Sequence, residues 1–205
     1  MKKELLIATH NPAKLNEILL ASQPLIKKEI RMLSLNDLHI SDEPVETGKT
    51  FCENAVLKAM YYFKLSGIPT LSDDGGVTID YLHGEPGIKS RRWLGYDAPD
   101  EPLIHHTLSQ LKKVPDEKRG AQLRICMCFT KNGKTSISVE ETIHGSIAHS
   151  PSSKRITGYP FRSLFIVSRF NRYYDELTEE EHLEINHRRK ALSQLLPQIE
   201  TELLK

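Results

Sequence analysis

A helical pattern of apolar residues stands out in the first third of the chain. Thr50 and Glu53 have the spacing of a capping box, so we expect a helix to begin at Thr50 and to end before Gly67. The apolar face of this helix consists of Phe51, Ala55, Ala59 and Tyr62. Asn54 and Lys58 lie one turn apart beside that face. The pattern therefore places a lysine on a rigid element at the edge of the core.

Short apolar runs and helical patterns alternate along the rest of the chain. The apolar runs predict strands at 5–9, 70–72, 77–82, 122–130, 135–142 and 163–167. The helical patterns predict helices at 12–22, 50–66 and 103–113. Thr178 and Glu181 cap a late helix, and a helical pattern at Leu192, Leu195, Leu196 and Ile199 runs to the C-terminus with a bend at Pro197. Asn132-Gly133 between two alternating runs is a strong hairpin signal. This mixture predicts an α/β protein with a mixed sheet and helices packed around it.

The first predicted strand leads into a helix start that suits phosphate. Asn11 is a good N-cap, and Pro12 suits the first helical position. Free backbone N–H groups and the positive end of the helix dipole attract anions at such a corner. Lys14, in the first turn, adds a full charge. By itself the pattern also fits an ordinary strand–helix corner with a solvated lysine.

A pair of adjacent carboxylates follows the strand predicted at 70–72. Asp73 and Asp74 precede Gly75 and Gly76, so we expect the acids to lie at a turn. Two adjacent acids on a turn repel each other unless a cation neutralises them. The pair therefore favours a divalent metal site.

The composition is that of a globular protein without a strong charge bias. Its 205 residues suit one domain, or one domain with two lobes, and 39% are hydrophobic and 27% charged. A net charge of +1 does not favour nucleic acid or an anionic membrane as a partner. No apolar run has transmembrane length and none forms a signal peptide, so we expect a cytoplasmic protein.

Three cysteines cannot all pair within one chain. Cys126 and Cys128 alternate with apolar residues, so their side chains share one face of a strand. We expect buried free thiols rather than a metal pair, because no matching second pair of ligands exists.

Five segments in this order resemble the inosine triphosphate pyrophosphatase family, also called the non-canonical purine nucleoside triphosphate pyrophosphatases. The five segments are Thr9–Lys14, Glu46–Ala59, Ser72–Arg91, a distorted Gly158–Phe165 and Asn186–Leu192. The resemblance covers nearly the whole chain, and its second and third motifs are long and specific. It implies one domain over 1–205, with a two-lobed fold around a long mixed sheet and the active site in the central cleft. It also implies a homodimer.

The resemblance implies Mg²⁺-dependent hydrolysis of ITP, dITP or XTP to the monophosphate and pyrophosphate. Carried over by position, Glu46, Asp73 and Asp74 hold the metal. Asp74 is the expected base for the attacking water, with Asp73 beside it as a second catalytic acid. The residues expected to bind the substrate are Thr9, Asn11, Lys14 and Lys58 for the triphosphate, His187 and Arg188 for the base, and Gly75, Tyr159, Phe161, Arg162 and His182 around them.

Several positions depart from the family pattern. Gly75 stands where Ser is usual, and Tyr159 takes the place of the stacking Phe. Arg162 replaces a carboxylate and presents only donors, so we expect it to favour bases with acceptors at their edge. His182 stands where Lys is usual. Gly75 lacks a hydroxyl that can contact the substrate phosphate, and together the changes make purine selectivity less secure than the triphosphate chemistry.

Two other classes of function remain open from the sequence. One is a nucleotide-binding or sensing protein that keeps the triphosphate site but turns over poorly, as Gly75 and Arg162 suggest. The other is a pyrophosphatase of the related septum-inhibitor family, with a shifted base preference. Intact Lys14, Lys58 and Asp74 disfavour the first, and the long match around Glu46 disfavours the second.

Overall fold

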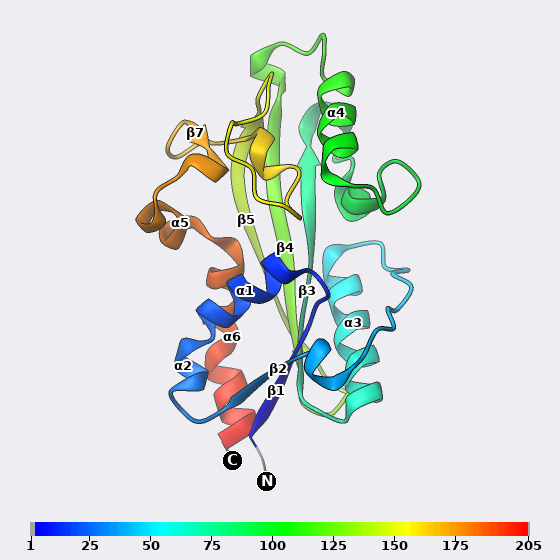
Figure 1. Ribbon diagram of the computed structural model, residues 1–205, viewed down its shortest axis with the longest axis vertical. Helices are drawn as coiled ribbons and strands as arrows, with labels where there is room; N and C mark the ends of the chain where they lie inside the picture. The colour runs from blue at the N-terminus through cyan, green and yellow to red at the C-terminus, as the bar shows by residue number, and fades with distance from the viewer. Residues whose placement is uncertain (1–2, 205) are drawn as a thin grey trace. The chain divides into compact units, whose positions relative to one another are not determined.

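The computed structural model describes residues 3–204, and within them seven strands form one mixed sheet. The strand order is β2-β1-β3-β4-β5-β6-β7 (Figure 1). The strands are β1 (Glu4–Ala8), β2 (Arg31–Ser34), β3 (Thr70–Ile79), β4 (Gly120–Thr130), β5 (Ile137–Ile147), β6 (Phe165–Val167) and β7 (Arg172–Tyr173). The helices are α1 (Pro12–Ala21), α2 (Gln23–Ile26), α3 (Phe51–Ser66), α4 (Asp100–Gln110), α5 (Glu179–Ile185) and α6 (His187–Leu204). The predicted α/β class is confirmed.

The sheet is mixed because it contains both parallel and antiparallel pairs of strands. β1 pairs in parallel with both β2 and β3. β6 pairs antiparallel with β5 and with β7. The strands β4 and β5 are neighbours in the sheet and flank Asn132-Gly133, as the hairpin signal predicted.

The chain forms two compact units, in agreement with the two-lobed expectation. Unit 1 contains residues 3–74, 125–141 and 187–204, and unit 2 contains 75–124 and 142–186. The boundary crosses β3 between Asp74 and Gly75.

Two apolar layers cover the two faces of β1 in unit 1. Leu5 and Ile7 pack into a core with α1 and α6, whereas Leu6 and Ala8 pack into a second core with Tyr62 of α3. Successive residues of a strand point to opposite faces, so one short apolar run serves both layers. Within unit 1, α1 and α6 therefore lie on one side of the sheet and α3 lies on the other (Figure 1).

The core of unit 2 is formed by one apolar cluster. Val77 and Ile79 of β3 pack there with Leu103 of α4 and Phe165 of β6. Tyr174 is fully buried in the same cluster.

Capping residues fix where the helices begin. Thr50 accepts a hydrogen bond from the Glu53 backbone N–H at 3.1 Å, so α3 begins where the sequence predicted. The Glu53 carboxylate accepts instead from the Lys49 N–H at 2.6 Å, so this capping box is only half formed. Before α5, Thr178 and Glu181 form a complete capping box.

Some predicted elements are corrected by the structure. The strands predicted at 70–72 and 77–82 are one strand, β3, and the predicted turn at Asp73 and Asp74 is wrong. Each of these acids has a cation beside it, so their charges do not interrupt the strand. The short elements β2, β7 and α2 were not predicted, because their runs are too brief to show a period. The C-terminal helix α6 continues through Pro197.

The expectation of free thiols is wrong for Cys126, which forms a disulfide with Cys52. Cys52 lies in the first turn of α3, and its Cα is 4.9 Å from that of Cys126 in β4. Cys128 is free and buried, and burial raises the pKa of its thiol to about 11. Alternation along β4 puts Cys126 and Cys128 on one face, but only Cys126 meets the start of α3.

No helix among the described residues is long and apolar enough to cross a membrane.

Candidate active site

The corner between β1 and α1 is built around Asn11. Its Oδ1 accepts hydrogen bonds from the backbone N–H groups of Ala13 at 2.9 Å and Lys14 at 3.2 Å. The Asn11 N–H in turn donates to Thr9 Oγ1 at 3.2 Å. These bonds fix the first turn of α1 and with it the Lys14 side chain.

Lys14 is paired with an acid, so the reading of a solvated lysine at this corner is wrong. Its Nζ lies 3.1 Å from Asp73 Oδ2, and its side chain is 18% exposed. Burial lowers the pKa of Lys14, and the attraction of Asp73 only partly offsets that effect.

Asp73 lies between two cations in the interior of unit 1. In addition to Lys14, Arg188 of α6 donates from Nε to Asp73 Oδ2 at 3.0 Å. Burial alone would raise the pKa of Asp73, but Lys14 and Arg188 outweigh it and hold that pKa below its usual range. The other oxygen, Oδ1, is buried and accepts no hydrogen bond from the described part of the chain.

Arg188 is oriented by a second acid that the sequence reasoning missed. Its Nη1 donates to Glu17 Oε2 at 3.1 Å, and the arginine is 4% exposed. Glu17 is three residues after Lys14 in α1, so both side chains lie on one face of that helix. This spacing could have indicated that Glu17 lies beside Lys14, but it does not indicate that Glu17 binds a residue of α6.

A second cluster gathers around Lys58 on α3. Its Nζ lies 2.9 Å from Glu46 Oε1 and 3.0 Å from Asp74 Oδ1. Burial acts to lower the pKa of Lys58, but Asp74 and Glu46 outweigh it and raise that pKa. Asn54, one turn earlier on α3, donates from Nδ2 to Asp74 Oδ2 at 3.2 Å.

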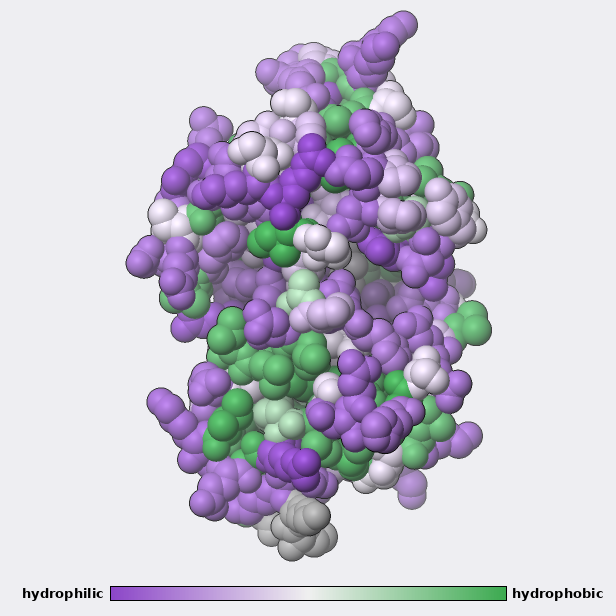
Figure 2. Space-filling view, in the orientation of Figure 1, coloured by the Kyte–Doolittle hydropathy of each residue, from purple (hydrophilic) through white to green (hydrophobic). Residues whose placement is uncertain are grey.

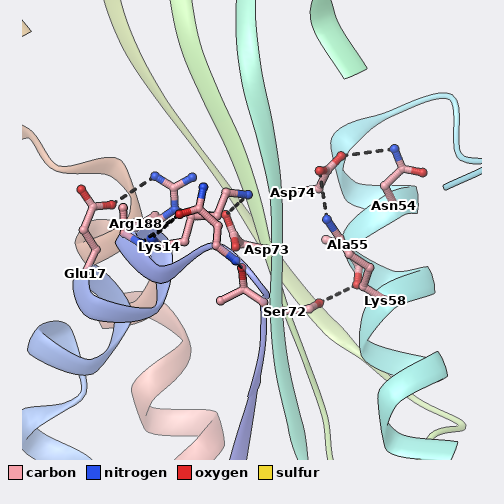
Figure 3. Close-up of polar contacts among 12 residues, drawn as sticks. Lys14, Glu17, Asn54, Ala55, Lys58, Ser72, Asp73, Asp74 and Arg188 are labelled. Carbon is pink, nitrogen blue, oxygen red and sulfur yellow. Dashed lines mark hydrogen bonds and ion pairs between the residues drawn. The ribbon is translucent and has the colours of Figure 1, made fainter. Parts of the chain in front are cut away.

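Asp73 and Asp74 point to opposite faces of β3 (Figure 3). Asp73 faces α1 and α6, and Asp74 faces α3, as alternation along a strand requires. Each acid therefore has its own side-chain cation, Lys14 for Asp73 and Lys58 for Asp74. Among residues 3–204, no group of three or more histidines, cysteines and carboxylates is arranged so that it could hold a metal ion, and the metal site at Glu46, Asp73 and Asp74 stays a prediction.

Five of the residues predicted around the base, Gly75 among them, lie in unit 2. The Arg162 guanidinium carbon lies 3.4 Å from the centroid of the Tyr159 ring and 4.7 Å from that of Tyr174. Tyr174 also contacts His182 edge-on, with ring centroids 4.8 Å apart. Phe161 is buried in the apolar core of this unit. The sequence did not point to Tyr174, whose run of residues looks like an ordinary loop.

Arg162 is 4% exposed, so it is not a surface residue on a distorted loop. Two aromatic faces hold its planar cation in place. Gly75, the remaining departure in this unit, is a residue of β3 directly after Asp74. His187, the other residue predicted to contact the base, begins α6 in unit 1 and is buried.

The chain belongs to the Ham1 family, whose model matches residues 5–198. A dITP/XTP pyrophosphatase of Bacillus subtilis (strain 168) is 35% identical over 193 residues, which cover 94% of this chain and 95% of that protein. A HAM1 protein from Coxiella burnetii has a similar structure, with a TM-score of 0.82, 30% identity and coverage of 95% and 98%. A nucleoside-triphosphatase, or dITP/XTP pyrophosphatase, from Mycobacterium abscessus has a TM-score of 0.75 and 33% identity, with coverage of 95% and 99%. The resemblance found in the motifs is therefore confirmed.

Proposed function

We propose that this chain is a nucleoside triphosphate pyrophosphatase that removes non-canonical purine nucleotides from the nucleotide pool. Its products are the nucleoside monophosphate and pyrophosphate. One observation supports the proposal most directly. Lys58 lies between Glu46 and Asp74, and the pair of Lys14 and Asp73 lies on the opposite face of β3. Cations for a polyphosphate and acids for a metal and a water thus gather around two successive residues of β3, Asp73 and Asp74. The family membership supports the same activity.

The triphosphate is the part of the substrate that the residues of unit 1 suit best. Lys14 sits in the first turn of α1, where the helix dipole also favours an anion. Lys58 supplies a second ammonium from α3. Thr9 and Asn11 shape the backbone of the β1–α1 corner, so we assign them to the phosphate-binding loop.

Glu46 and Asp74 fit the needs of Mg²⁺. Both carboxylates converge on one cation, the Lys58 ammonium. Mg²⁺ is commonly held by one or two carboxylates together with substrate phosphates, so a cage of three protein ligands is not required. We propose that these two residues hold the metal, which when bound would neutralise charge on the phosphates. Asp73 is left out of this assignment, because it faces the other side of β3.

Asp74 is the better candidate for the general base. Its two oxygens are held by Lys58 and Asn54, which leaves further acceptor sites on each oxygen for a water molecule. Asp73 is bound to two cations, which hold its pKa below its usual range and make it a weaker base. We assign Asp73 to fixing Lys14 and Arg188.

The base preference rests on the cluster in unit 2. Relatives are named for dITP and XTP, and purines with an oxo group at C6 present acceptors to a donor. Arg162 offers donors only, so we propose that it favours oxo-purines, with XTP at least as good a substrate as ITP. His187, Arg188 and His182 stay assigned to the base by position alone.

A sensing protein with weak turnover is the second candidate. Gly75, which removes a hydroxyl, and the Arg162 stack favour it. The two candidates are separated by one measurement, because a sensor binds triphosphate without releasing pyrophosphate.

We also propose a cytoplasmic homodimer. Apolar side chains gather over the part of unit 1 that contains α1 and α2 (Figure 2). Leu20 and Ile26 in these helices are exposed, and exposed apolar surface of this kind suits association. Sedimentation at several protein concentrations tests the proposal, and a monomer at all of them would contradict it.

The decisive experiment measures products from a panel of triphosphates: ITP, dITP, XTP, dUTP and the four standard ribonucleotides. We expect pyrophosphate and monophosphate from the oxo-purines with Mg²⁺, and loss of activity with excess EDTA. Release of orthophosphate with a diphosphate would contradict the proposed cleavage position. Tight binding without products would favour the sensor.

A further inference from the structure

We infer that Asn54 is a positioning residue that fixes the Asp74 carboxylate and joins it to the segment carrying Glu46. The inference rests on the proposed function, because it concerns the proposed base and a proposed metal ligand. Asn54 lies in the first turn of α3 and is 1% exposed. A side chain so deeply buried must satisfy its amide with protein partners.

The orientation of the Asn54 amide follows from its partners. The Gly48 backbone N–H donates to Asn54 Oδ1 at 2.8 Å. A backbone N–H can only donate, so the amide oxygen must face Gly48. The NH₂ group must then face Asp74, to which it donates at 3.2 Å. Two contacts thus lock one side chain.

The Asp74 carboxylate is held at both oxygens by one helix. Asn54 contacts Oδ2 and Lys58 contacts Oδ1. The two residues are four apart in α3 and lie on one face of it. The plane of the Asp74 carboxylate is therefore fixed by a helix, α3, rather than by a loop.

The position of α3 against β3 is fixed as well. Ser72 Oγ, two residues before Asp74, donates to the Ala55 carbonyl oxygen at 2.6 Å. Ala55 directly follows Asn54, so this bond fixes where Asn54 lies along β3 relative to Asp74 (Figure 3). A base aimed at one water needs such a fixed frame, since a displacement of 1 Å can cost about a hundredfold in rate.

Gly48 is a glycine because Asn54 approaches it closely. A Cβ at this position would lie 2.5 Å from Asn54 Oδ1 and 2.8 Å from the Asn54 backbone nitrogen. Such distances are shorter than real contacts, so any side chain would push the segment away from α3. Glu46 lies two residues before Gly48 and would move with it. One asparagine therefore couples the two acids that surround Lys58.

The test compares variants in the same turn of α3. Asn54→Ala removes both contacts, and Asn54→Asp keeps an acceptor for Gly48 but removes the donor to Asp74. Gly48→Ala should push the segment that carries Glu46 away from α3 while leaving the Asn54 side chain in place. Thr50→Ala is the matched control, because Thr50 caps α3 and does not contact Asp74. We expect this control to lower Tm by about 3 °C with unchanged kcat.

We expect Asn54→Ala and Asn54→Asp each to lower kcat by about tenfold or more, with KM changed by less than about threefold. Gly48→Ala should lower kcat in the same direction and raise the Mg²⁺ concentration needed for half-maximal rate. A readout apart from activity is amide hydrogen exchange at Gly48. Its N–H should exchange faster in Asn54→Ala and stay protected in Asn54→Asp and Thr50→Ala.

Two outcomes overturn the inference separately from the proposed function. If the unaltered enzyme releases pyrophosphate and the Asn54 variants lose no more kcat than Thr50→Ala, Asn54 only caps and packs. An Asn54→Asp variant with full kcat would likewise remove the role of the donor to Asp74. If the unaltered enzyme releases no pyrophosphate from any triphosphate, the proposed function itself fails, and the role of Asn54 fails with it.

Discussion

Asp73 and Asp74 are adjacent in β3, yet each carboxylate is bound by cations from different helices. Asp73 Oδ2 lies 3.1 Å from Lys14 of α1, and Asp74 Oδ1 lies 3.0 Å from Lys58 of α3. Alternation along the strand places the two side chains on opposite faces of the sheet. Variants at these neighbouring positions should therefore have different effects.

Replacing Asp74 with Asn should lower kcat by at least about a hundredfold, the scale of losing a general base. The amide keeps the size of the side chain, so the fold should persist. Circular dichroism and pyrophosphate release measured on the same sample check both points. A folded Asp74→Asn enzyme with near-normal turnover would exclude Asp74 as the base.

Asp73→Asn should act mainly on stability. It leaves Lys14 and Arg188 without the acid between them, and breaking a buried ion pair typically costs about 3 kcal/mol or more in the free energy of unfolding. Urea unfolding at pH 7 measures this loss. A variant as stable as the unaltered protein at pH 7 would show that the pair adds nothing.

The same variant should show a characteristic pH dependence. The pKa of Asp73 is lower in the folded protein than the unfolded value of about 3.9. The stability that Asp73 contributes is therefore present above about pH 4 and is lost as the pH falls through the folded pKa. The stability difference between the unaltered protein and Asp73→Asn should shrink when unfolding is measured below about pH 4.

Replacing Lys58 with Met should weaken triphosphate binding and also reduce stability. The stability loss is expected because Lys58 is the shared cation of Glu46 and Asp74. Loss of a charged contact to phosphate is worth about 2 kcal/mol, so we expect KM to rise roughly thirtyfold. Lys64→Met, at an exposed position of the same helix, is the control. A stability loss with unchanged KM would leave Lys58 with a structural role only.

Reduction of the Cys52–Cys126 disulfide should lower the melting temperature by about 10 °C. The bond joins residues 74 apart in sequence, and closing a loop of that size stabilises by about 4 kcal/mol in the chain-entropy model. The melting temperature is measured with and without dithiothreitol. Cys52→Ala should not respond to the reductant. Thiol titration of the denatured, unreduced protein should find one thiol, from Cys128, and three would exclude the bond.

Arg162→Met should lower the ratio of catalytic efficiencies for XTP over ITP. Methionine keeps an apolar stem between Tyr159 and Tyr174 but lacks the guanidinium donors. Arg169→Met, at an exposed arginine of unit 2, is the control. An unchanged ratio with unchanged stability would mean that Arg162 does not read the base.

Local signals predicted the elements of the site, and long-range contacts decided how its residues pair. The caps at Asn11 and Thr50, and the positions of Lys14 on α1 and Lys58 on α3, follow from short patterns. The partner of Asp73 on α6 is 115 residues away, and nothing in the sequence near either residue indicates it. The turn expected at Asp73 and Asp74 was wrong for the same reason, because the cations that allow a strand there come from α1, α3 and α6. The disulfide also depends on packing between α3 and β4.

The stack of Arg162 on Tyr159 and Tyr174 has a consequence for how such sequences diverge. An aromatic face is electron-rich, so it attracts a guanidinium and repels a carboxylate. A relative with an acid at the position of Arg162 gains nothing from an aromatic ring at that of Tyr174. Substitutions at these two positions should therefore occur together in evolution, and a single exchange of Arg162 should be tolerated poorly until position 174 changes as well.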